Sequence, residues 1–234
     1  MADKQRIQLI DALRGLAVLL MVVHHFLYDL VAFCGAPAWL FSNPVFNFLH
    51  YIFAGLFLFL SGVSSNFSRS NVKRGLKALA CALVITAVTT VMDMPIVFGV
   101  LHLLGTCMVL YGLTRRFWEK LPFWVVPVVS VVGIVLTGHM AGGVMSESRW
   151  LWMLGWVYEG FVSTDYFPLL PWAFVFLLGT WAGKYIKAGR MPRWFYTADC
   201  PPLAAVGRHS LVIYVLHQPV LYVLTMAGLW LFGR

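Results

Sequence analysis

The chain has 234 residues, of which 61% are apolar, 16% are aromatic and only 11% are charged. A water-soluble domain of this length needs more polar residues to cover its surface, so the composition excludes a soluble globular protein and predicts an all-α membrane protein. The net charge of +8 does not indicate a nucleic-acid partner, because the basic residues lie in short loops between apolar segments, as on the cytoplasmic side of membrane proteins.

A window of about twenty residues, the length of helix that crosses a bilayer, predicts a bundle of about seven transmembrane helices. The predicted spans are residues 9–33, 46–64, 75–91, 96–113, 122–138, 167–186 and 209–229. With a cytoplasmic N-terminus, only Arg149 and Arg234 of the 17 basic residues fall on the outer side, so we expect this orientation. We expect a single domain over residues 1–234, as a multi-pass protein of the cell's inner (plasma) membrane.

The first span carries ionisable side chains on one stripe. Arg14 and His25 are eleven residues apart, which is about three helical turns and about 16 Å along one face. Asp11 precedes Arg14 by one turn, and Asp29 follows His25 by one turn. Such groups cost a few kcal/mol each inside a bilayer and usually face a bundle interior or a pathway, so the stripe predicts a polar site along this helix.

These residue types suggest specific roles. The His25–Asp29 spacing suits a general base and the carboxylate that orients it, whereas the alternative for His25 is a hydrogen bond to a neighbouring helix. The Arg14 guanidinium matches phosphate geometry, with a salt bridge to Asp11 as the alternative; Asp11 can also orient Arg14 toward a ligand. His24 lies about 100° around the helix and favours a packing role over substrate contact.

Basic residues cluster at the inner membrane face. Arg69, Lys73 and Arg74 recur at helical spacing after the second span, and Arg208 precedes the last span at the same level. They can contact anionic lipid or bind a polyphosphate ligand such as a nucleotide or coenzyme A.

The remaining polar candidates lie in the outer half of the expected bundle. His102 lies within the first two turns of the fourth span, and Asp165 opens the sixth in DYFPLLPW, as a helix cap or an acceptor contact. His217 and Gln218 lie near the middle of the last span as candidate substrate contacts. The Trp-rich segment 148–163 predicts an interfacial or re-entrant helix at the outer surface. The four cysteines are scattered without a CxxC pair, so we expect no metal site.

The first-helix sequence IDALRGLAVLLMVVHHF resembles the signature of the transmembrane acyltransferase superfamily, in which Arg and His are separated by ten residues. The segments FLSGVSSN, FGVLHLLG, DYFPLLPW and GRHSLVIYVLHQP, in this order, resemble the bacterial branch that is similar to heparan-alpha-glucosaminide N-acetyltransferase. The resemblance extends from Arg6 to about Leu221.

This resemblance implies transfer of an acyl group, usually acetyl, from cytoplasmic acyl-CoA to an acceptor amine or hydroxyl at the outer side, such as that of an amino sugar or glycan. Acetyl-CoA or another acyl-CoA is then the co-substrate, Arg14 serves the CoA side, His25 is the base, and His102 can stabilise the oxyanion. In the lysosomal member the catalytic His follows the first helix, whereas this chain has no His between His25 and His50. The acyl transfer therefore follows more directly than the amino-sugar acceptor.

Two other functions remain open from the sequence. A proton-coupled multi-helix transporter could use the same His and Asp side chains as a relay, although no inverted repeat is visible. A structural or lipid-binding membrane subunit would leave the Arg14–His25 stripe unexplained. The expected partners are the lipid bilayer, acyl-CoA and a small acceptor, and a homodimer is left open.

Overall fold

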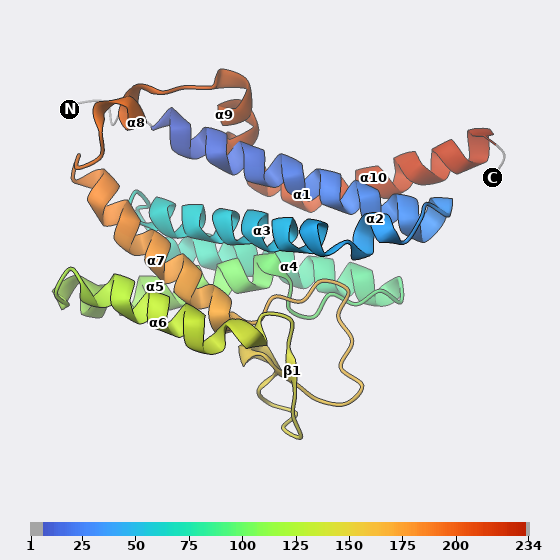
Figure 1. Cartoon of the computed structure of the whole chain (residues 1–234), viewed down its shortest axis with the longest axis horizontal. Coiled ribbons are helices and arrows are strands. Elements are labelled where there is room, and N and C mark those ends of the chain that lie inside the picture. The colour runs from blue at the N-terminus through green and yellow to red at the C-terminus, as the bar shows by residue number, and fades with distance from the viewer. Residues whose placement is uncertain (1–6, 233–234) are drawn as a thin grey trace. The chain divides into compact units, whose positions relative to one another are not determined.

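The computed structural model describes residues 7–232 and is almost entirely helical (Figure 1), as expected for an all-α membrane protein. The α-helices are α1 (Gln8–Cys34), α2 (Trp39–Ser42), α3 (Pro44–Ser65), α4 (Asn71–Val91), α5 (Val100–Lys120), α6 (Val125–Thr137), α7 (Leu169–Lys187), α8 (Arg193–Thr197), α9 (Pro201–Arg208) and α10 (Ser210–Phe232). The other elements are the 3-10 turns Gly138–Met140 and Trp152–Leu154 and the strands β1 (Val144–Met145) and β2 (Trp156–Val157).

All seven predicted spans coincide with helices. By length and composition, 5 helices in the described part of the chain can cross a membrane, namely α1, α3, α4, α7 and α10. The other two are α5, whose last turns carry charged residues, and α6, which has only 13 residues. The chain is therefore a multi-pass helical membrane protein, and the count of about seven spans depends on α5 and α6.

The expected interfacial helix at 148–163 is absent, and this prediction was wrong. The segment contains a 3-10 turn of three residues and strand β2, which pairs in parallel with β1. Gly155 and Gly160 adopt φ values of 118° and 82°, which interrupt any helix. The aromatic rings pack on one another instead, with 5.0 Å between the ring centres of Phe161 and Tyr166. Burial raises the pKa of Tyr166 to about 12, and its hydroxyl donates to the Trp152 carbonyl.

The chain forms two compact units, one from residues 1–57 and 191–234 and one from Leu58–Arg190, with α3 running through the division. In the first unit, α9 and α10 lie along α1 (Figure 1). Gly207 of α9 abuts the backbone carbonyl of Asp11, and Gly15 of α1 abuts that of Leu203, so no side chain fits between these helices. This close approach places the α9 end against the first turns of α1.

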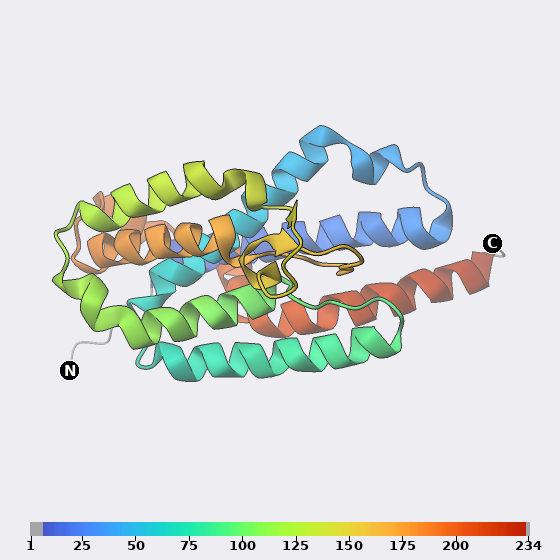
Figure 2. The same cartoon turned by 90° about the horizontal axis from the view of Figure 1, so that it is seen from below.

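In the second unit, α4 and α5 form one antiparallel pair, and α6 packs against α7 (Figure 2). The second half of α3 packs on α7 through Gly62 and Gly179, each of which lies against a backbone carbonyl of the other helix. Small residues at these positions allow backbone-to-backbone packing, the usual way in which membrane helices associate.

Candidate active site

The strongest concentration of unpaired polar groups lies in the first unit, among α1, the first half of α3 and α10. Three imidazoles, a carboxylate and an amide belong to site residues that the sequence predicted, and a fourth imidazole comes from α3. The members are His24, His25, Asp29, His50, His217 and Gln218. We call this set the histidine cluster.

His25 and His217 face each other across α1 and α10. Their ring centres are 4.7 Å apart and their planes are inclined by 76°. Nδ1 of His25 lies 2.9 Å from the Met21 carbonyl oxygen, and Nδ1 of His217 lies 2.7 Å from that of Tyr214. A carbonyl only accepts hydrogen bonds, so each Nδ1 carries a proton, and in a neutral ring the lone pair is then on Nε2. The Nε2 atom of His217 is buried without a hydrogen-bond partner.

Asp29 is fully buried, at 0% exposure. Its Oδ1 atom accepts a hydrogen bond of 2.8 Å from the Gln218 amide, whereas Asp29 Oδ2 and Gln218 Oε1 are buried without partners. The carboxylate is therefore held by α10, and the group that fixes the His25 ring is the Met21 carbonyl. The sequence could place Asp29 near His25, but a backbone carbonyl partner leaves no signal in the sequence.

His24 pairs with His50, which sequence reasoning did not include among the site residues. The distance from His50 Nδ1 to His24 Nε2 is 2.8 Å. The His24 ring also stacks on Phe46, with 5.1 Å between ring centres, and packs against Phe41. This aromatic environment favours a packing role for the pair, and the polar spacing in the first helix alone could not have identified His50.

Arg14 forms the ion pair with Asp11, one turn earlier on α1, that the sequence offered as the alternative to a phosphate contact. The Arg14 Nη1 atom donates to Asp11 Oδ1 at 2.8 Å, and only 16% and 6% of the two side chains are exposed. Arg208 is exposed at the end of α9, directly after the Gly207 contact with α1. The first unit therefore has guanidinium groups toward the start of α1 and imidazoles about three turns further on.

His102 lies in the second unit, where both of its ring nitrogens are hydrogen-bonded. The Gly99 amide donates to Nδ1 at 3.3 Å, and Nε2–H donates to Thr86 Oγ1 at 3.0 Å. Thr86 in turn donates to the Ile96 carbonyl at 2.6 Å. Both ring nitrogens of His102 are thus engaged at the start of α5, and its oxyanion role stays a prediction.

Asp165 is a helix cap, but of a different helix from the one it precedes. Its Oδ2 atom accepts from the amide of Val100, the first residue of α5, at 3.3 Å. The residue before α7 is Pro168, whose side chain makes no capping hydrogen bond. The sequence suggested a cap because Asp precedes a proline-rich helix start, and missed the partner because it lies 65 residues away.

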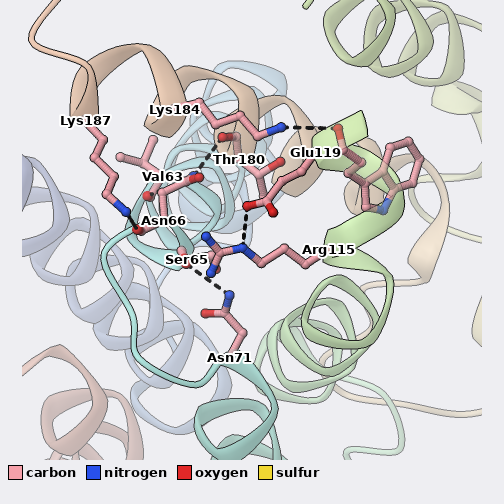
Figure 3. Close-up of polar contacts among 10 residues, drawn as sticks. Val63, Ser65, Asn66, Asn71, Arg115, Glu119, Thr180, Lys184 and Lys187 are labelled. Atoms are coloured by element: carbon pink, nitrogen blue, oxygen red, sulfur yellow. Dashed lines mark hydrogen bonds and ion pairs between the residues drawn. The ribbon is translucent and has the colours of Figure 1, made fainter. Parts of the chain in front are cut away.

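Two lysines of α7 bind carbonyls at the ends of other helices in the second unit (Figure 3). Lys187 donates to the Asn66 carbonyl at 2.9 Å, and Lys184 donates to that of Trp118 at 3.2 Å. These hydrogen bonds supply donors to carbonyls at the C-terminal ends of α3 and α5, which have no partner within their own helix. The predicted CoA-side residues Arg69, Lys73 and Arg74 are instead exposed around the start of α4.

The histidine cluster has four buried atoms without partners; one is His24 Nδ1, and the other three share one chemical property. Asp29 Oδ2, Gln218 Oε1 and His217 Nε2 are all hydrogen-bond acceptors, and all three are buried. Buried acceptors without donors are costly, so such a group is complementary to a ligand that brings several N–H or O–H donors. In the described part of the chain, no group of three or more His, Cys, Asp or Glu side chains is placed to hold a metal ion.

Comparison with protein families gives one match, to the family described as "Heparan-alpha-glucosaminide N-acetyltransferase, catalytic", over residues 6–219. No curated protein and no solved structure matches the chain.

Proposed function

We propose that this chain, which belongs to the heparan-alpha-glucosaminide N-acetyltransferase catalytic family, transfers an acetyl group from acetyl-CoA to an amine within the membrane. The family is one of membrane acetyltransferases; the donor, the acceptor and the residue roles are our proposal. The observation that carries it is the distance of 2.9 Å between His25 Nδ1 and the Met21 carbonyl oxygen, which fixes the ring of His25.

His25 is the general base in this proposal. Its bound Nδ1–H fixes the ring and directs the basic Nε2 atom away from the α1 backbone. The acceptor nitrogen attacks the thioester carbonyl, the C–N bond forms and the C–S bond breaks. His25 takes a proton from the attacking nitrogen and returns it to the departing thiolate, giving free CoA thiol.

The acceptor is an amine, and the unpaired acceptors support this choice. Asp29 Oδ2 and Gln218 Oε1 can together receive two N–H bonds from an ammonium group, and the carboxylate matches its charge. A hydroxyl would bring a single donor and no charge, which leaves one of these buried oxygens unpaired.

The CoA end of the donor lies toward the start of α1. Arg14, oriented by Asp11, offers a planar guanidinium to a phosphate, and Arg208 is close by on the helix that packs there. The pantetheine arm then follows α1 for about 16 Å toward His25. Arg69, Lys73 and Arg74 are the second unit's candidates for phosphate or anionic lipid.

A test uses protein purified into lipid nanodiscs with acetyl-CoA and glucosamine, followed by thiol release. The expected result is turnover in the wild type and loss of turnover in His25→Gln, with acetyl-CoA binding retained. The matched control is His209→Gln, because His209 is exposed and its Nδ1 also binds a backbone carbonyl one turn back. Equal turnover in His25→Gln and His209→Gln would refute the assignment of the base.

The same experiment separates this enzyme from a proton-coupled transporter. A transporter could relay protons through the same imidazoles, but it would release no thiol from acetyl-CoA. The orientation with a cytoplasmic N-terminus in the inner membrane is part of the proposal, because the donor is cytoplasmic.

A further inference from the structure

We propose that His217 is a second base of the reaction, which takes the first proton from the bound ammonium before His25 takes the second. This inference rests on the proposed function, because it concerns the same site and the same acceptor. It concerns a residue of the last helix whose imidazole carries a lone pair in a buried position.

The chemistry requires two proton acceptors. An ammonium reacts with an acetyl thioester to give an amide, a thiol and one free proton, so two N–H bonds break while one C–N bond forms and one C–S bond breaks. One proton ends on sulfur and the other leaves the site. A single imidazole holds only one extra proton at a time, so two protons require either two bases or an acceptor that arrives already deprotonated.

The geometry supplies two equivalent imidazoles. Both His25 and His217 use Nδ1–H to bind a carbonyl of their own helix, and both therefore offer Nε2 as an acceptor. Their ring centres are 4.7 Å apart, so the two imidazoles belong to one site. His102, by contrast, has both ring nitrogens occupied and offers no such atom.

The cluster that contains His217 also holds a carboxylate. The next residue, Gln218, binds Asp29, which is the only carboxylate of the cluster in the described residues and is fully buried. The other titratable groups that face the site are His24 and His25 on α1, His50 on α3 and Tyr214 on α10. In the proposed sequence His217 takes the acceptor's first proton, and His25 takes the second from the attacking nitrogen and passes it to the departing thiolate.

A purely structural role for His217 predicts different behaviour. A ring that only packs between α1 and α10 could be replaced by another aromatic ring at any pH with the same effect. A base is needed only while the acceptor is an ammonium, so its loss should matter at acidic pH and disappear once the acceptor is a free amine.

The first test compares His217→Phe with the wild type over a pH series, with glucosamine as the acceptor. We expect kcat/KM of the variant to be reduced roughly a hundredfold where glucosamine is protonated, and to approach the wild-type value at alkaline pH. The control is Tyr222→Phe, which keeps the ring that packs on Phe33 one turn further along α10. A reduction that is the same at every pH, or no reduction at acidic pH, would overturn the proposal.

The second test does not depend on activity. In ¹⁵N-histidine-labelled protein in nanodiscs, the nitrogen shifts report which ring nitrogen carries the proton. We expect neutral His217 to be protonated at Nδ1, with Nε2 gaining the proton on acidification; a neutral His217 protonated at Nε2 would overturn the proposal. If the wild type released no thiol, the proposed function would fail, while this measurement would still decide whether His217 can accept a proton.

Discussion

Two polar networks in this molecule contain the same residue types but differ in how completely their atoms are paired. In the second unit, His102, Thr86 and Asp165 make hydrogen bonds around the start of α5, and both ring nitrogens of His102 are used. In the first unit, buried atoms of Asp29 and His217 lack partners. A paired network stabilises a fold, whereas unpaired buried acceptors cost stability and indicate a place for a ligand.

The largest expected effect separates the two networks by replacing one histidine in each. His25→Gln should reduce kcat by about a hundredfold or more, because it removes the base, and should leave the melting temperature close to that of the wild type. His102→Gln should do the opposite: it should lower stability by about 1–3 kcal/mol, because it leaves buried partners unpaired, and keep kcat of the folded protein. Thiol release and thermal unfolding in nanodiscs measure both quantities, and a fall in kcat for both variants alike would contradict the distinction.

The next effect concerns the two carboxylates. Asp29→Asn keeps the shape of the side chain and removes its charge, so KM for glucosamine should rise about tenfold while stability stays equal or increases. Asp165→Ala should cost about 1 kcal/mol of stability through loss of the α5 cap and leave KM unchanged. Steady-state kinetics with varied glucosamine measure this; an unchanged KM in Asp29→Asn would remove Asp29 from the acceptor site.

A third prediction tests how α9 is positioned. Gly207→Ala places a methyl group where the Asp11 carbonyl lies, so we expect a loss of about 1–3 kcal/mol and weaker acetyl-CoA binding as Asp11 and Arg14 shift. Gly228→Ala on α10 meets open space and is the control. Equal melting temperatures for the two variants would show that α9 does not pack on α1 as described.

The smallest expected effect compares two inner lysines. Lys187→Met removes the donor to the Asn66 carbonyl and should cost about 1 kcal/mol without changing KM for acetyl-CoA. Lys73→Met removes an exposed charge and should raise this KM slightly while stability is unaffected. Acetyl-CoA titrations and thermal unfolding of both variants distinguish the two roles. A raised KM in Lys187→Met and a loss of stability in Lys73→Met would contradict this assignment.

The sequence predicted the helices well because hydropathy and loop charge are local properties. It placed Arg14, Asp11, His25 and Asp29 on one stripe of α1, and the Arg14–Asp11 ion pair is confirmed. It failed where the partner is distant or lacks a side-chain signal: the Met21 carbonyl that holds His25, the Gln218 amide that holds Asp29, and the α5 amide that Asp165 caps.

The segment 148–163 shows a different limit of sequence reasoning. Its tryptophans indicated an interface helix, but two glycines with positive φ and the mutual packing of aromatic rings produce a turn and a short strand pair instead. Composition alone could not predict this backbone conformation, because the segment packs on a residue outside it, Tyr166.

The most direct test of the central claim incubates wild-type protein and His25→Gln in nanodiscs with acetyl-CoA and glucosamine. Free thiol and acetylated sugar are measured in the same samples. The account predicts that the wild type forms both products in equal amounts and that His25→Gln forms neither above background. Equal rates in the two proteins, or thiol release without acetylated amine, would contradict it.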